Sequence, residues 1–290
     1  MRSRQGSRAR LIAVSQHAWS ELAARLAQAD AVLVRVARVQ GSGPREEGAW
    51  MAVWLGALVN TIGGGRLELD AIARARELLK QNACPGWHDA PELQRMALGP
   101  SLGQCCGGVV EVSYQRITAQ DWPHIQEALR PKLHPVALFG GGHVGRALVR
   151  AMAPLAFEVR WIDSRDEIFP PDVPPNVYCE HSDPVQAAVA DLAPGSAVLI
   201  MSFSHAEDLD VVAACLERQR AKGDLPYVGL IGSKTKWATF RHRLEARGWQ
   251  ESDWNHVTCP IGLPEIHGKE PEVVAASTVA QLLIQLRQTG

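Results

Sequence analysis

Apolar and polar residues alternate in the first half of the chain, a pattern typical of β-strands that bury one face. In segment 31–39, valines occupy alternate positions on the side opposite Arg35. Further strands are expected at 50–54, 57–62 and 108–114. One helix interrupts this series, because apolar residues recur at helical spacing from Leu69 to Leu79. Together these elements predict an α+β domain.

Short apolar runs alternate with helical segments in the second half of the chain. The runs that predict strands are 136–139, 158–162, 176–180, 197–203 and 227–231. Strands that alternate with helices predict a parallel, doubly wound sheet. A polar connection at 115–135 contains three prolines and separates the two patterns. We therefore expect an α/β protein with an N-terminal α+β domain, residues 1–120, followed by a Rossmann-like domain, residues 121–290.

The composition excludes several functional classes. In the 290-residue chain, 30 basic residues balance 31 acidic ones, whereas nucleic-acid-binding proteins usually carry a basic excess. No apolar run approaches the length of a membrane-spanning helix, and the run that starts at Leu11 is shorter than the core of a signal peptide. We therefore expect a cytoplasmic protein with no nucleic-acid or membrane partner, whose six cysteines are reduced thiols.

A glycine-rich motif follows the first strand of the second half. Gly140, Gly142 and Gly145 form the pattern G-x-G-x-x-G at the start of a helix, where backbone N–H groups can approach a phosphate. Asp163 ends the next strand, where an acidic side chain can bind a ribose hydroxyl. The motif predicts a Rossmann fold and indicates a nucleotide site. The glycines alone also serve close packing between strand and helix, so the binding of a dinucleotide stays open.

A second glycine loop precedes the helix of the first half. The backbone N–H groups of Gly63, Gly64 and Gly65 could form an anion pocket together with Arg66. The alternative is a plain turn at the start of a helix. Arg45 follows a rigid glycine–proline turn, where it could clamp a phosphate or a carboxylate, or simply face water.

Two adjacent cysteines mark the most unusual segment of the sequence. Cys105 and Cys106 follow Gln104 and precede two glycines, which leave the thiols approachable. Thiolates are nucleophiles and soft metal ligands, and no second cysteine pair lies at the spacing of a zinc site. The alternative is that these cysteines are buried as small apolar residues. The four other cysteines are expected to be structural: Cys84, Cys179, Cys215 and Cys259.

Six segments combine into an ordered set that is more specific than any of its members. They are 41–45, 63–68, 98–108, 139–145, 227–234 and 260–264. The set resembles the xanthine dehydrogenase accessory protein family, XdhC/CoxI. The resemblance extends over about residues 30–288, and the cysteine–glycine segment is its most telling part.

The resemblance implies an N-terminal domain that handles the molybdenum cofactor, molybdopterin, and a C-terminal Rossmann domain. Such a protein binds the finished cofactor, protects it, supports its sulfuration and inserts it into an apo xanthine dehydrogenase-type molybdoenzyme. A cysteine desulfurase-type partner would donate the sulfur, and a homodimer is compatible with the family. Residues that the resemblance assigns to the cofactor are Arg45, Gly63, Gly64, Gly65, Arg66 and Gln104, with Cys105 and Cys106 as metal ligands.

Two other functions stay open. The Rossmann motif also suits an NAD(P)-dependent oxidoreductase, for which His205, just past the fourth strand, is the best placed proton donor. That function leaves the cysteine–glycine segment without a role. The other option is a sensor or scaffold that binds a nucleotide in the second half and a protein through the first. We expect an accessory protein rather than an enzyme, with NAD(P) or another nucleotide as an open option for the Rossmann domain.

Overall fold

The computed structural model of the protein describes residues 16–98, 108–129 and 133–288. The chain forms two compact units, and the division falls between Lys132 and Leu133. Helix α3 (Trp122–Leu129) belongs to the N-terminal unit because its buried side chains join the core of that unit. This unit therefore extends beyond residue 120, where the sequence suggests the boundary.

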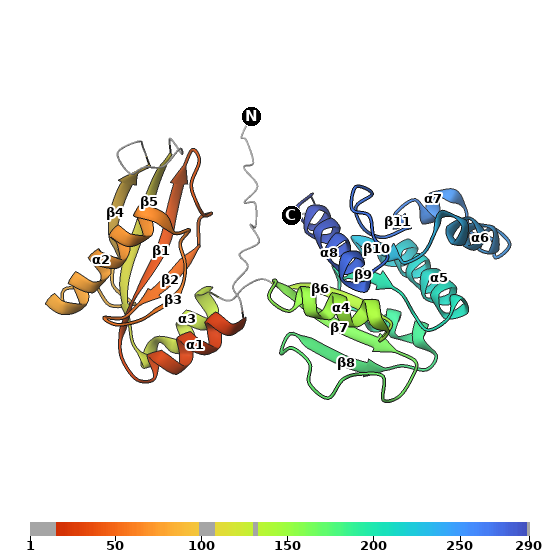
Figure 1. Cartoon of the computed structure of the whole chain (residues 1–290), viewed down its shortest axis with the longest axis horizontal. Coiled ribbons are helices and arrows are strands. Elements are labelled where there is room, and N and C mark those ends of the chain that lie inside the picture. Colours follow the sequence, from red (N-terminus) through yellow and green to blue (C-terminus); the bar gives the residue numbers. More distant parts are fainter. Residues whose placement is uncertain (1–15, 99–107, 130–132, 289–290) are drawn as a thin grey trace. The chain divides into compact units, whose positions relative to one another are not determined.

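The N-terminal unit is built on a five-stranded antiparallel sheet (Figure 1). Its strands are β1 (Ala31–Gln40), β2 (Trp50–Val53), β3 (Leu58–Asn60), β4 (Glu92–Ala97) and β5 (Val109–Ile117), in the spatial order β3-β2-β1-β5-β4. The sequence does not predict β4, because only Met96 in this edge strand is buried and the apolar alternation is weak. The antiparallel sheet with its helices confirms the α+β character expected of this half.

Helices cover the two faces of this sheet. On one face, α2 (Gly65–Gln81) buries the apolar stripe that the sequence predicts, including Ile72 and Ala75. On the other face lie α1 (Gln16–Leu26) and α3, which follows the short 3-10 helix η2 (Ala119–Asp121). The ring of Trp19 on α1 contacts the rings of Trp50 and Trp122 there. The core of the unit is thus divided by the sheet into two clusters.

A β-bulge in β1 changes the face to which the following side chains point. Val36 pairs with Val112 and Arg38 pairs with Glu111, so Ala37 is the extra residue on β1. Val36 packs in the core beneath α2. Without an extra residue, Arg38 would share that face, because side chains two residues apart on a strand point the same way. The bulge therefore turns Arg38 to the face opposite α2.

The C-terminal unit contains a six-stranded parallel sheet. Its strands are β6 (His134–Phe139), β7 (Phe157–Asp163), β8 (Val177–His181), β9 (Ala197–Ile200), β10 (Tyr227–Leu230) and β11 (Val257–Thr258). Their spatial order, β11-β10-β9-β6-β7-β8, places the first strand at the centre and the later strands on its two sides. This is the strand order of a Rossmann fold, so the predicted doubly wound domain is confirmed.

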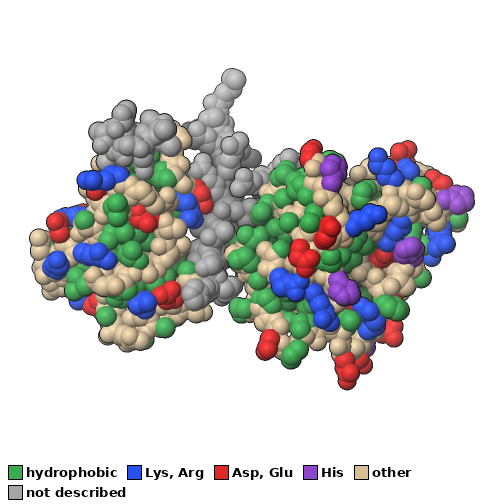
Figure 2. Space-filling model, in the orientation of Figure 1, with side chains coloured by type: hydrophobic (Ala, Val, Ile, Leu, Met, Phe, Trp, Pro, Cys, Tyr) green, Lys and Arg blue, Asp and Glu red, His purple; other side chains and the backbone are tan. Residues whose placement is uncertain are grey.

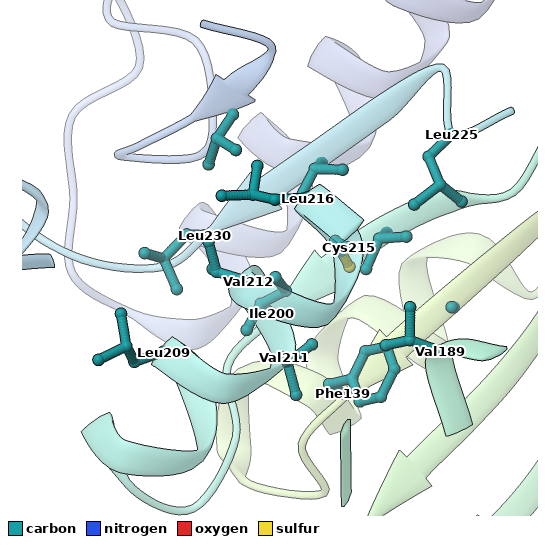
Figure 3. Packing of buried hydrophobic residues seen from close by; sticks show 14 of the residues in the cluster. Phe139, Val189, Ile200, Leu209, Val211, Val212, Cys215, Leu216, Leu225 and Leu230 are labelled. Atoms are coloured by element: carbon teal, nitrogen blue, oxygen red, sulfur yellow. The ribbon is translucent and has the colours of Figure 1, made fainter. Parts of the chain in front are cut away.

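Helices pack on both faces of the parallel sheet. One face carries α4 (His143–Met152) and α8 (Pro271–Gln288), and the other carries the 3-10 helix η3 (Val185–Asp191), α5 (His205–Lys222), α6 (Lys234–Glu245) and α7 (Glu251–Trp254). Figure 3 shows the core of the second face, a cluster that contains Phe139 and Leu230 of the sheet and Val211 and Val212 of α5. The sulfur of Cys215 lies among these apolar side chains, as expected of a structural cysteine.

The surface carries charges of both signs. Figure 2 shows basic and acidic side chains interspersed on the visible face of each unit, in keeping with the balanced composition. Among the described residues, no helix combines the length and the apolar character needed to cross a membrane.

Candidate functional site

The glycine loop at 63–65 is held against the segment that contains Arg45. Gly63 has a φ of 121°, in the region that side chains rarely adopt. A Cβ at Gly63 would also lie 2.7 Å from the Cβ of Pro44 and 3.0 Å from the Cγ of Arg45. Only glycine allows this approach, so the sequence motifs at 41–45 and 63–65 meet in one place.

A carboxylate of the protein itself occupies the position that the sequence suggests for an external anion. The backbone N–H groups of Ile62 and Gly64 donate to Oε2 of Glu68 at 3.0 and 3.1 Å. The hydroxyl of Thr61 donates to the same oxygen. Arg66 points away along the helix surface, where its side chain is 62% exposed and pairs with Asp70. An anion pocket at 63–66 thus stays a prediction, and in this conformation Glu68 accepts its amide hydrogen bonds.

The third motif of the N-terminal unit is the cysteine–glycine segment, and its last residue in the sequence set, Gly108, lies against the loop at 41–45. The backbone N–H of Leu98 donates to the carbonyl of Gly108 at 2.7 Å, so the two residues that flank segment 99–107 are joined. A Cβ at Gly108 would lie 2.2 Å from the carbonyl oxygen of Ser42. The expected ligands Gln104, Cys105 and Cys106 lie outside the described residues. Gly108, which follows this segment, nevertheless contacts the loop at 41–45, which in turn contacts Gly63.

A charged cavity lies at this end of the sheet. It has a volume of about 90 Å³ and is lined by Arg38, Gln40, Arg95, Val109 and Glu111. Sequence reasoning missed both arginines. Arg95 belongs to the edge strand that the sequence does not predict, and Arg38 reaches the cavity only through the β-bulge.

Two of the three glycines in the Rossmann motif are required by packing. A Cβ at Gly140, whose φ is 121°, would lie 2.0 Å from the carbonyl oxygen of Met201, and a Cβ at Gly145 would lie 2.1 Å from that of Gly140. At Gly142, by contrast, a Cβ would meet nothing within 4 Å. Gly142 immediately precedes α4, so it is the one glycine of the three with open space beside the helix N-terminus.

Asp163 is directed into the protein. It is 1% exposed, and its carboxylate accepts hydrogen bonds from the backbone N–H of Gly141 at 2.6 Å and from the backbone and guanidinium of Arg165 at 2.9 Å. Burial alone would raise the pKa of Asp163, but the bonds from Arg165 and Gly141 outweigh it and lower this pKa. A ribose contact through Asp163 therefore stays a prediction, and the carboxylate here joins the ends of β6 and β7.

The other polar residues at the carboxyl edge of the parallel sheet are also engaged. The guanidinium of Arg165 lies 4.5 Å from the ring centroid of the exposed Phe203. Asp208 pairs with Lys236 at 2.5 Å, so neither group is free for an external ligand. His205 begins α5, and its ring contacts that of Phe240. The sequence suggests His205 as the proton donor of an oxidoreductase, but nothing in these contacts orients its ring to donate a proton.

Four cysteines lie among the described residues, and all four are free thiols: Cys84, Cys179, Cys215 and Cys259. Burial raises the pKa of Cys84 to about 11 and that of Cys259 to about 11. Both groups are therefore protonated at neutral pH and are poor nucleophiles. Within the described part of the chain, no three His, Cys, Asp or Glu side chains are grouped so that they could hold a metal ion.

The chain matches two models of one protein family. The model described as the XdhC Rossmann domain matches residues 136–282, just over half of the chain, and the model of the XdhC and CoxI family matches residues 24–84. The chain belongs to the XdhC family. The resemblance that the six sequence motifs indicate is thereby confirmed.

Two further proteins are similar to this XdhC-family chain. Uncharacterized protein YqeB of Escherichia coli (strain K12) is 27% identical over 256 residues, which are 87% of this chain and 42% of that protein. The chain thus spans less than half the length of this relative. A crystal structure from Bacillus halodurans, described as a xanthine dehydrogenase, has a TM-score of 0.73 and 20% identity, and the match covers 93% of this chain and 96% of that one. At this identity the likeness shows a shared fold.

The family models include most of the candidate residues. Arg45 and the glycine loop at 63–66 lie within the match at 24–84, and the Rossmann glycines and Asp163 lie within the match at 136–282. The cavity is only partly included, since Arg38 and Gln40 precede residue 84 whereas its other residues follow it. Among the described residues, Arg38 and Arg95 of the cavity form no ion pair.

Proposed function

We propose that this XdhC-family chain is a non-catalytic accessory protein in the maturation of a xanthine dehydrogenase-type enzyme. Its cargo would be the molybdenum cofactor, an anionic pterin that carries a phosphate and binds molybdenum through a dithiolene. Family membership supports the accessory role. The cargo and its handling are the finer part of the proposal, and they rest on the arrangement of the N-terminal unit.

The observation that carries the proposal is the convergence of three motifs at one end of the antiparallel sheet. The loop at 41–45 contacts Gly63 on one side and Gly108 on the other. Gly108 follows directly on the segment with Cys105 and Cys106. A carrier of this cofactor needs positive charge for the phosphate and soft ligands for the metal, and this end of the unit has two arginines near the ends of the segment whose sequence contains the two cysteines.

The delivery steps belong to the same proposal. The partners would be the apo molybdoenzyme and a cysteine desulfurase-type protein that supplies sulfur for the sulfido ligand. Because a tightly bound cofactor could not leave, transfer requires that the apo-enzyme bind it better than the carrier does. The Rossmann unit would contribute a nucleotide site or a docking surface.

Loading with cofactor tests the proposal directly. The full chain is purified without oxygen from cells that make the cofactor, and molybdenum and pterin are measured for wild type, Cys105→Ala and Cys106→Ala. We expect both components near one per chain in wild type and a loss of about tenfold or more in at least one variant. Cys179→Ala is the matched control, because Cys179 is exposed in the other unit and should keep full loading.

A nicotinamide titration separates the proposal from an oxidoreductase. The strand order of the parallel sheet and the open position at Gly142 favour some nucleotide binding. Micromolar affinity for NAD or NADP in a chain that never retains pterin would overturn the carrier function. Pterin loading together with nucleotide affinity would leave the carrier function intact and assign the nucleotide to the Rossmann unit.

A further inference from the structure

The cavity lies on the sheet face opposite α2. The pairing of its strands places acidic and basic residues together on this face. Glu111 on β5 is directly opposite Arg38 on β1 and directly opposite Arg95 on β4. Directly opposed residues of antiparallel strands point their side chains to the same face. The cavity is therefore lined by Glu111 with an arginine on the strand to either side of it, neither of which forms an ion pair with it, and by Gln40.

Among the described residues, the arginines of the cavity form no ion pair with a carboxylate. Four other arginines of the unit do form such pairs: Arg25, Arg66, Arg74 and Arg116. Among the described residues, neither Arg38 nor Arg95 is within ion-pair or hydrogen-bond distance of a partner. Arg35 lies on the same face of β1, one pleat away, and burial lowers its pKa. On this face of β1, β4 and β5, three arginines thus outnumber one carboxylate, that of Glu111.

The β-bulge explains how Arg38 comes to this face. An unbroken strand would direct Arg38 beneath α2, where Val36 is buried. The extra residue Ala37 interrupts the hydrogen-bond ladder and turns Arg38 to the face on which Arg95 lies, with Glu111 of β5 between them. Bulges are frequent next to binding and catalytic sites, where they redirect a side chain. The local irregularity of β1 is thus the feature that assembles the cavity.

The cavity also lies next to the residues that flank segment 99–107. Val109, which lines it, is opposite Ala97 at the end of β4. The next residues of the two strands, Leu98 and Gly108, are hydrogen-bonded to each other. A ligand held in the cavity therefore lies close to both ends of segment 99–107.

We propose that this cavity binds a phosphate monoester, and that the ligand it serves is the phosphate end of the pterin cargo. The identity of the ligand rests on the proposed function, whereas anion binding rests on the cavity alone. Each guanidinium can donate two parallel hydrogen bonds to phosphate oxygens, and the amide of Gln40 can donate another. Glu111 repels the phosphate, which keeps the affinity moderate and suits a carrier that must release its cargo.

Inorganic phosphate is the first probe. Its affinity for the full chain is measured by calorimetry at constant ionic strength for wild type, Arg38→Gln and Arg95→Gln. Each substitution removes a charged donor, so we expect affinity to fall by about tenfold. Glu111→Gln removes the repelling charge, so we expect affinity to rise severalfold. A structural role for Glu111 could not produce this gain.

Arg25→Gln is the matched control, because Arg25 lies in the same unit on the exposed surface of α1, where it pairs with Glu21. We expect its phosphate affinity to equal that of wild type. The proposal is overturned if Arg25→Gln weakens binding as much as Arg38→Gln, or if Glu111→Gln leaves affinity unchanged. Both cavity arginines are exposed, so the variants should fold, and circular dichroism with thermal unfolding checks that they do.

Cofactor loading then distinguishes the ligand from the site. If wild type retains pterin and Arg38→Gln with Arg95→Gln loses most of it, both the cavity and its ligand are supported. If the double variant retains pterin fully, the cavity is not its phosphate site, although the carrier function stands. If wild type retains no pterin but binds phosphate in the pattern above, the anion site stands and the carrier function fails.

Discussion

Replacing Asp163 by asparagine tests whether this residue joins the ends of β6 and β7 or binds a ribose. The substitution keeps the shape but removes the charge that accepts hydrogen bonds from Gly141 and Arg165. Hydrogen bonds to a charged group contribute about 1.5–3 kcal/mol, and leaving a partner unpaired adds to the loss. Because Arg165 is one-third exposed and can be solvated, we expect Asp163→Asn to destabilise the C-terminal unit by about 2–4 kcal/mol.

The measurement must report on the C-terminal unit separately from the N-terminal one. Hydrogen exchange with mass spectrometry, in increasing urea, follows peptides from β6 and β7. At an m-value of about 2 kcal/mol/M, the midpoint should fall by about 1–2 M. Asp166→Asn is the control, since Asp166 is 82% exposed and should change stability by less than about 0.5 kcal/mol. A variant Asp163→Asn as stable as wild type but with weaker nucleotide affinity would refute the structural role.

The stability that Asp163 contributes depends on pH. The pKa of Asp163 in the folded protein lies below its unfolded value of about 3.9, because the bonds from Arg165 and Gly141 outweigh burial. Its ionised form therefore stabilises the fold above that value, and the contribution is lost as the pH falls through the folded pKa. The difference between wild type and Asp163→Asn should shrink below about pH 4. A constant difference from pH 7 to pH 3 would contradict the assignment.

Three further outcomes follow from local geometry. Glu68→Gln should destabilise the N-terminal unit by about 1 kcal/mol, because the carboxylate holds the amides of the glycine loop, and urea unfolding of that unit measures it. Gly145→Ala should lower the melting temperature markedly, since its Cβ would lie 2.1 Å from a carbonyl oxygen, whereas Gly142→Ala should not; equal effects would contradict this packing. Alkylation of Cys259, whose pKa is about 11, should accelerate about tenfold per pH unit between pH 8 and 10, and a plateau near pH 8 in peptide mass spectrometry would refute the protonated thiol.

The elements that sequence patterns predict well are those in which local chemistry and burial agree. The central strands β6 and β9 are apolar runs buried on both faces, and the glycines after β6 mark the turn into α4. The strand expected to reach residue 203 ends at Ile200, because the turn before α5 engages Ser202 and Phe203 in hydrogen bonds with residues of that helix. Such ends depend on contacts that a hydrophobic pattern does not encode.

The features that cannot be predicted from the sequence are those that depend on the pairing of one strand with another. The bulge at Ala37 exists only in the register between β1 and β5, so the sequence cannot show that Arg38 leaves the face of Val36. Likewise, Arg95 becomes a neighbour of Arg38 only because β5 lies between their strands. Charged residues from three separate segments therefore line a cavity that no sequence motif predicts.

Both glycine loops show why a motif alone does not identify a ligand site. Each offers backbone N–H groups beside a helix N-terminus, and in each a carboxylate of the protein accepts one of them: Glu68 takes that of Gly64, and Asp163 takes that of Gly141. An external anion would have to displace a carboxylate that is already well placed and, for Asp163, held by an arginine. Positive charge without an acidic partner gives an external anion a better alternative. Among the described residues of the N-terminal unit, Arg38 and Arg95 supply that charge beside a cavity, so the phosphate site is expected there rather than at the glycine loop.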